Sequence, residues 1–276
     1  MGIIDFILNL AGLLLWLNWR AEEADPVGKR KPATLIGTLR RADSNNGGNW
    51  KSPAIIGGLI LLRALFYWQI GSVVHWVGKL NLGVIELSFR SDFFGLMLVF
   101  SIFSFVVTLG IFYLCLLLLS VLDGPEPFRS VVRLQLGGMD GWRRGTKLFL
   151  PPATVSSLWW LASWLLAWLQ IIPQPASELR RLGESLIVGL GSYSAWKFLA
   201  VALILLHLVN SYIYFGKHPF WNFVNAEAQT LLTPLKKIPL RLGKMDFSPV
   251  VATTLIFLLA GLAERLLNFL YGRLQS

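Results

Sequence analysis

Long apolar stretches, separated by shorter polar connections, run along the whole chain. A helix needs about 20 mostly apolar residues to cross the hydrocarbon core of a bilayer. Six stretches approach or exceed this length, at residues 3–19, 53–77, 93–121, 154–172, 186–215 and 249–271. The pattern predicts an all-α, polytopic transmembrane protein with about six spans. The first stretch would reach only about 25 Å as a helix, so it either spans the bilayer or lies in its interface.

The Lys and Arg residues of the connections predict the orientation of these spans. Connections 20–52, 122–153 and 216–248 carry seven, five and five of them, whereas 78–92 and 173–185 carry two each. Cytoplasmic connections of membrane proteins are the ones enriched in Lys and Arg. The alternation therefore places the three basic connections in the cytoplasm. With six spans, both termini would lie outside.

The composition agrees with a membrane protein and excludes a soluble domain. Hydrophobic residues make up 55% of the chain and charged residues only 14%, whereas a soluble domain carries roughly a quarter charged residues. The formal net charge of +10 would indicate nucleic-acid binding in a soluble protein, but in a membrane protein it marks cytoplasmic loops. We therefore expect no nucleic acid as a partner. The basic loops are expected to contact the anionic headgroups of membrane lipids.

The polar segments divide the chain into three predicted parts. Residues 1–85 are an N-terminal helical hairpin around a mobile cytoplasmic loop at 21–50, which is polar and lacks apolar periodicity. Residues 86–180 and 181–276 each contain a helix, a basic loop and a helix. We expect the last two parts to be copies of one unit.

Corresponding prolines support this internal repeat. Phe128 and Phe220 each follow a proline and lie 92 residues apart, and Pro152 and Pro249 precede apolar stretches and lie 97 residues apart. A difference of five residues in loop length reconciles the two offsets. The correspondence predicts a duplicated helix-loop-helix unit, a common origin of membrane-protein folds.

Each basic loop of the repeat also contains a short amphipathic segment. In the second loop, Trp221, Val224 and Ala228 fall three or four residues apart, with Glu227 assigned to the opposite face. Apolar residues at this spacing share one face of a helix. We expect a short interfacial helix here, with Glu227 on its polar side, and a similar one over 128–136.

The second basic loop carries the most distinctive motif of the chain. Prolines on both sides of a lysine pair disfavour regular helix there. Asp246 or Ser248 can cap the last apolar helix, with Pro249 in its first turn. The motif comprises Pro219, Pro234, Lys236, Lys237, Pro239, Asp246, Ser248 and Pro249.

This motif resembles the YggT family of integral membrane proteins, whose repeats pair two membrane helices around a proline-bracketed basic loop followed by Asp-hydrophobic-Ser-Pro. The resemblance is strong over residues 186–276 and weak over 90–172, where the Asp-x-Ser-Pro element is missing. It implies a protein of the bacterial inner membrane. Members of the family are linked to osmotic and ion homeostasis, to cell division or nucleoid organisation, and in plastid relatives to assembly of a cytochrome complex.

Three ionisable residues inside the predicted spans are candidates for function. Arg63 lies near the centre of the second stretch, Lys197 in the fifth and Glu264 in the sixth. A charge at mid-bilayer costs at least about 2.5 kcal/mol. In one interpretation the three form a charge-compensated cluster along an ion path. In the other, Lys197 and Arg265 extend to the outer interface and Arg63 binds a carbonyl or a lipid phosphate.

Motifs for catalysis or for cofactors do not occur in the sequence. The three histidines are not at metal-binding spacing, and Cys115 lies alone in an apolar stretch, so we expect neither a metal site nor a disulfide. No phosphate-binding loop or nucleophile motif is found, and we expect no enzyme activity and no cofactor. The leading hypothesis is a non-enzymatic membrane factor of the YggT type. The alternatives are an accessory subunit of a larger membrane complex, bound to other membrane proteins or to itself, and a small ion or solute channel.

Overall fold

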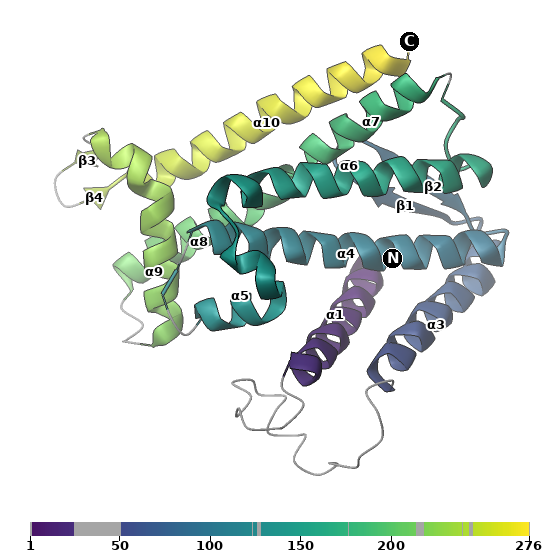
Figure 1. Cartoon of the computed structure of the whole chain (residues 1–276), viewed down its shortest axis with the longest axis horizontal. Helices are drawn as coiled ribbons and strands as arrows, with labels where there is room; N and C mark the ends of the chain where they lie inside the picture. The colour runs from purple at the N-terminus through teal and green to yellow at the C-terminus, as the bar shows by residue number, and fades with distance from the viewer. Residues whose placement is uncertain are drawn as a thin grey trace. The chain divides into compact units, whose positions relative to one another are not determined.

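The computed structural model describes residues 2–24, 51–122, 124–125, 128–175, 177–213, 218–238, 240–242 and 245–275. Most of them are helical (Figure 1), which confirms the all-α class. The predicted mobile loop lies, from residue 25 onward, outside the described residues. Internal contacts divide the chain into two compact units. Unit 1 comprises Met1–Gly78 and Arg90–Leu109, and unit 2 comprises Lys79–Phe89 and Gly110–Ser276.

Unit 1 is built from apolar helices. Helix α1 (Gly2–Ala24) packs against α3 (Lys51–Val74), and the first half of α4 (Phe94–Leu122) completes the unit. A glycine brings α1 close to α4, because a Cβ at Gly12 would lie 2.7 Å from the ring of Phe105. The first apolar stretch is therefore a full-length helix packed into unit 1.

A short β-hairpin, which the apolar pattern did not predict, connects α3 to α4. Strand β1 (Val77–Asn81) pairs with β2 (Glu86–Arg90), and alternate residues of β2 are buried. Gly83 forms the turn with a φ of +86°, and its amide donates a hydrogen bond to Asn81 Oδ1 at 2.7 Å. Strands of five residues show too little alternation to stand out in a sequence dominated by spans.

Unit 2 contains the same order of helices twice. The first set comprises the second half of α4, α5 (Phe128–Leu136), the 3-10 turn η2 (Gly137–Gly141) and α6 (Arg144–Trp168). The second set comprises α8 (Ser194–Tyr212), α9 (Pro219–Leu232), the 3-10 turn η3 (Thr233–Lys237) and α10 (Ser248–Gln275). Helix α7 (Glu178–Gly191) lies between the sets, and two-residue strands β3 (Arg241–Leu242) and β4 (Met245–Asp246) pair before α10. This order of elements is the one that the predicted duplication requires, and the duplication itself stays a prediction.

Helix α6 contains two prolines, and the second leaves a carbonyl free that binds the turn between α7 and α8. A proline has no N–H, so the carbonyl four residues earlier lacks its helical partner. For Pro152 that carbonyl belongs to Leu148, which accepts a hydrogen bond from the Tyr193 hydroxyl at 2.6 Å. Pro152 thus leaves the Leu148 carbonyl free to accept a hydrogen bond from Tyr193, which lies between α7 and α8.

Helix α7 lies close along α6. Its first turn is capped by Ser177, whose side chain accepts a hydrogen bond from the Arg180 amide at 3.2 Å. Near its end, a Cβ at Gly189 would lie 2.6 Å from the carbonyl oxygen of Pro152 and would also collide with the Ser156 side chain. Only glycine permits this approach of the two helices.

The core of unit 2 includes the meeting point of α8, α9 and α10. Each contributes one buried residue to a cluster of Ile204, Leu232 and Ala252. Figure 1 shows α9 running crosswise to α10, near the point where α10 begins. Helix α8 is also tied to α4, because Trp196 Nε1 donates a hydrogen bond to the carbonyl of Leu114 at 2.8 Å.

Within the described ranges, five helical segments are long and apolar enough to cross a membrane, namely Gly2–Ala21, Lys51–Val74, Phe94–Leu122, Glu178–Tyr212 and Ser248–Leu274. They match five of the six predicted stretches, and the chain is a helical integral membrane protein. Most of the remaining stretch, 154–172, lies in α6, which ends at Trp168 and is not among these five segments. The fifth span begins at residue 178, earlier than predicted, and is broken between α7 and α8. The orientation of the termini and the three-part division stay predictions.

Candidate functional site

The two repeats meet through aromatic side chains of their short helices. Phe128, the first residue of α5, stacks on Phe223 of α9 with 4.7 Å between ring centroids. It also meets Phe220 edge-on, with 6.1 Å between centroids. Phe128 and Phe220 are the positions that correspond in the sequence repeat. Equivalent ends of α5 and α9 therefore contact each other.

A buried polar cluster lies beside this aromatic contact and joins the end of α4, η2 and the start of α6. The ammonium group of Lys147 donates a hydrogen bond to Ser120 Oγ at 2.7 Å, and the Ser120 hydroxyl donates to Asp140 Oδ1 at 2.5 Å. Lys147 Nζ and Asp140 Oδ1 are 3.6 Å apart, and their side chains are only 6% and 8% exposed. The cluster is a buried ion pair completed by a hydroxyl, the arrangement that compensates desolvation of both charges.

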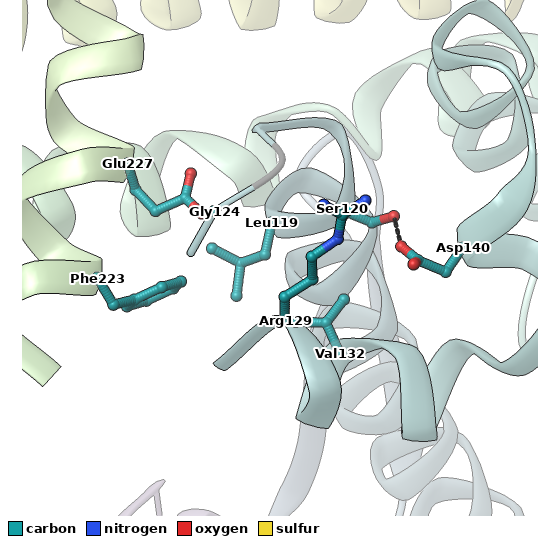
Figure 2. Close-up of a pocket in the computed structure, with 8 residues that line it drawn as sticks. All are labelled: Leu119, Ser120, Gly124, Arg129, Val132, Asp140, Phe223 and Glu227. Atoms are coloured by element: carbon teal, nitrogen blue, oxygen red, sulfur yellow. Dashed lines mark hydrogen bonds between the residues drawn. The ribbon is translucent and has the colours of Figure 1, made fainter. Parts of the chain in front are cut away.

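Two arginines of α5 add positive charge around Asp140. Arg133 Nε lies 3.4 Å from Asp140 Oδ2, and Figure 2 shows Arg129 extending from α5 toward Ser120. Burial alone would raise the pKa of Asp140. The hydrogen bond from Ser120, that from Arg133 and the charges of Lys147 and Arg129 outweigh this effect, so the pKa of Asp140 lies below its ordinary value. Asp140 is therefore ionised at neutral pH.

A second carboxylate near this cluster belongs to Glu227 of α9. Its side chain packs directly against Gly124, where a Cβ would collide with the carboxylate, and the residue is only 1% exposed. Val224 and Ala228 are buried as predicted, but the assignment of Glu227 to the solvent side was wrong. The reason is that α9 also packs beside the segment following α4, so its buried face is wider than the apolar stripe.

A cavity of about 10 Å³ lies between the polar cluster and Glu227 (Figure 2). Its lining residues are Leu119, Ser120, Gly124, Arg129, Val132, Asp140, Phe223 and Glu227. Such a space holds about one water molecule. It offers polar partners to a water or a small ion and has no room for an organic substrate.

The pairing of Ser120 with Lys147 does not form a nucleophile and base. A serine activated by lysine requires a neutral amine that can take the hydroxyl proton. Here Lys147 Nζ donates a hydrogen bond to Ser120 Oγ, and the Ser120 hydroxyl donates to Asp140 Oδ1, so the hydroxyl hydrogen is directed at the carboxylate and not at the lysine. The arrangement holds three elements together and favours a structural role for the serine.

Loss of the Asp140 charge is expected to destabilise unit 2. Because its folded pKa is lowered, the stabilisation is present above the ordinary pKa of the unfolded chain and is lost as the pH falls through the folded pKa, from about 5 downward. Asp140→Asn should lower the free energy of unfolding by about 1.5 kcal/mol at pH 7. The unfolding temperature of this variant should also decrease less steeply than that of the wild type as the pH falls. The measurement is thermal unfolding in detergent between pH 7 and pH 3. Asp92→Asn, at an exposed pair with Arg90, is the matched control, and equal behaviour of the two variants would contradict the assignment.

The residues of the second-loop motif lie at the starts of helices and turns. Pro219 is in the first turn of α9, whose preceding His218 accepts a hydrogen bond from the Phe220 amide at 3.2 Å. Pro234 is the second residue of the 3-10 turn η3, which also contains Lys236 and Lys237. These prolines fit because the first turn of a helix does not need their missing N–H.

The end of the motif caps α10. Asp246 Oδ1 accepts a hydrogen bond from the Ser248 amide at 2.9 Å, so the structure assigns the cap to Asp246. Ser248 and Pro249 are both buried at the first turn of α10. Pro239 lies outside the described residues. The described part of the motif thus shapes the connection between α9 and α10.

Lys197 and Glu264 form an ion pair between α8 and α10. Lys197 Nζ lies 2.5 Å from Glu264 Oε1, with side chains 16% and 33% exposed. The same ammonium lies 5.0 Å from the centroid of the Phe198 ring. The pair compensates both charges, whereas the first interpretation of the sequence had grouped these two residues with Arg63.

Arg63 belongs to unit 1 and has partners that neither interpretation named. Its guanidinium donates hydrogen bonds to Asp5 Oδ1 at 2.6 Å, Asn9 Oδ1 at 2.7 Å and Ser104 Oγ at 2.8 Å. Asp5 Oδ1 also accepts a hydrogen bond from the Tyr67 hydroxyl at 2.5 Å. The side chain of Arg63 is 2% exposed. It is the centre of a polar network that joins α1, α3 and α4.

Sequence reasoning missed the acidic and hydroxyl partners at both polar sites. For Arg63 a signal was present, because Asp5, Asn9 and Gly12 are spaced by four and three residues and share one face of an apolar helix. For Lys147, neither Ser120 nor Asp140 is distinguished by spacing. Within the described residues, no group of three or more His, Cys, Asp or Glu side chains could hold a metal ion.

Comparison with known proteins identifies one segment. Residues 191–267 match the family described as CCB3/YggT. The chain matches no curated protein and no solved structure. The match covers α8, α9 and most of α10, including the Lys197–Glu264 pair and Glu227. The resemblance to the YggT family is thereby confirmed over this segment.

Proposed function

We propose that this protein is a non-enzymatic membrane factor that acts by assembling with other membrane proteins. The proposal starts from the match of residues 191–267 to the CCB3/YggT family. The proposal includes a bacterial inner membrane as its location and cytoplasmic basic loops. A role in membrane-complex assembly is favoured over the other processes linked to the family, namely osmotic or ion homeostasis and cell division.

The proposal rests on one observation, namely that the charged side chains inside the spans pair with each other between helices. Arg63 is paired with Asp5, and Lys197 with Glu264, and each pair joins different helices. Where ionisable side chains line a transport path, they must be able to interact with the passing ion. Charges that bind each other across helices instead hold a bundle in one arrangement, which suits a scaffold.

Helix α10 supplies a surface for such assembly. Only 6% of its most apolar stretch is buried within the chain. Leu255, Leu259 and Leu262 lie on one side of it at spacings of four and three residues and are 42%, 56% and 54% exposed. In a membrane this surface meets either lipid or the helix of a partner.

The test is the size of the assembly extracted from native membranes in a mild detergent. We expect a defined high-mass complex on native gels, and expect Leu259→Ala combined with Leu262→Ala to weaken it. The matched control combines Leu62→Ala with Leu65→Ala on α3, where the side chains are 54% and 43% exposed, and should leave the complex intact.

Two outcomes would contradict the proposal. A small homo-oligomer without other proteins would indicate an autonomous factor. Ion flux in proteoliposomes that changes in Lys197→Ala and Glu264→Ala would indicate a channel, because these substitutions break the pair between α8 and α10. Unchanged flux in both variants would support the scaffold.

A further inference from the structure

The corner formed by α5, η2 and the start of α6 exposes large apolar side chains. Met139, Trp142 and Phe149 are 40%, 46% and 77% exposed, and Val131 on α5 is 49% exposed. A different face of α5 is covered, because Val132 and Leu136 pack with Leu116 and Leu117 of α4 in a buried cluster. The uncovered apolar surface therefore points away from the body of unit 2.

The same corner is strongly basic. Residues 128–149 contain Arg129, Arg133, Arg143, Arg144 and Lys147, whereas Asp140 is their single acidic residue. Asp140 is already engaged by Ser120, Lys147 and Arg133. Arg143 and Arg144 are exposed, so their charges face outward beside Trp142.

The start of α6 strengthens the positive potential. Arg143 is the residue preceding the helix, and its side chain makes no capping hydrogen bond. The first amides of a helix carry partial positive charge, and basic side chains in this position are unfavourable unless an anion is present. An anion placed between Arg143 and Arg144 would relieve this repulsion.

We propose that the basic corner, defined as Arg133, Trp142, Arg143, Arg144 and Phe149, binds the headgroup of an anionic phospholipid. The phosphodiester would lie against the two adjacent arginines, and the acyl chains against the aromatic side chains. The corner directly follows the candidate span α4 (Phe94–Leu122), which places it where headgroups are found. A phospholipid matches both features, because its headgroup carries the negative charge and its acyl chains are apolar.

This inference goes beyond the proposed function, because it holds whether or not the protein assembles with partners. The test combines Arg143→Gln with Arg144→Gln in the full chain. The matched control combines Lys79→Gln with Arg90→Gln, which removes the same two charges from the β-hairpin, where these side chains are 68% and 72% exposed. Each protein is titrated with phosphatidylglycerol or with phosphatidylcholine in detergent, and bound lipid is counted by native mass spectrometry.

We expect the Arg143/Arg144 variant to bind phosphatidylglycerol about thirtyfold more weakly, at roughly 1 kcal/mol for each of the two basic residues at the membrane surface. The control variant and the binding of phosphatidylcholine should change little. Arg143→Lys with Arg144→Lys should retain most of the affinity, and inorganic phosphate should not displace the lipid. Equal loss in both glutamine variants would overturn the proposal. So would unchanged lipid binding together with loss of a co-purifying acidic protein.

Discussion

Replacing Asp5 with alanine is expected to lower the free energy of unfolding by about 3 kcal/mol, because it leaves a buried arginine without its carboxylate. Arg63 is 2% exposed and depends on Asp5 for its charge partner at 2.6 Å. Asn9 and Ser104 would still accept hydrogen bonds but carry no negative charge. The measurement is thermal unfolding, or unfolding in SDS, of the purified protein in detergent.

Two further variants distinguish the loss of the buried ion pair from the general effect of removing a charge on stability. Asp92→Ala removes a carboxylate from the exposed pair with Arg90 and should change stability by less than about 1 kcal/mol. Asp5→Ala combined with Arg63→Met should be less destabilised than the sum of the single variants, because no unpaired charge remains. If Asp5→Ala behaves like Asp92→Ala, the network of unit 1 does not hold its helices.

Adding one methyl group at Gly189 is expected to cost about 2 to 3 kcal/mol, since α6 and α7 must separate to admit it. The new Cβ of Gly189→Ala would meet the Pro152 carbonyl oxygen, which belongs to the backbone and cannot rotate away. Separation would also strain the hydrogen bond from Tyr193 to Leu148. Lower thermal stability of the full chain in detergent is the expected result.

The matched control is Gly261→Ala in α10. No atom lies within 4 Å of the position that its Cβ would take. Alanine favours helix over glycine by up to about 1 kcal/mol, so this variant should be neutral or slightly more stable. The close packing of α7 on α6 would be refuted if both glycine variants moved stability in the same direction.

The fold class and most spans were predictable because they depend on local composition. An apolar stretch of sufficient length has few alternatives to a helix in lipid, where every backbone polar group must be satisfied internally. α6 shows the limit of this reasoning. Its apolar stretch is helical, but ten residues N-terminal to it, from Arg144, also join the helix because they pack in unit 2.

Amphipathic patterns predicted the short helices of the loops but not all of their buried faces. The spacing of Val224 and Ala228 assigned the correct stripe of α9, and the same pattern assigned Glu227 to solvent. The amphipathic pattern of a helix assigns burial to its apolar face alone. Gly124, far away in sequence, covers Glu227 on a second side, and no local pattern reports such a neighbour.

The polar sites were predicted only in part. One of the two sequence interpretations grouped Lys197 and Glu264 with Arg63, because opposite charges in spans require compensation. In the structure Lys197 pairs with Glu264, whereas Arg63 pairs with Asp5. Asp140 and Ser120 became visible as partners of Lys147 only through the packing of η2 and α6 on the end of α4. For Arg63, the network includes Asn9 and Ser104, residues that a hydropathy pattern treats as interruptions.

By itself, the sequence determined that this is a polytopic helical membrane protein, that its loop helices occur twice and that residues near the C-terminus carry a proline-bracketed basic motif. These features follow from stretches of neighbouring residues, whose hydrophobicity and backbone restrictions act locally. Only the tertiary structure decided which charges meet and which carboxylates are buried. The physical reason is that an ion pair depends on distances of about 3 Å between helices, and side chains of residues far apart in the chain set those distances.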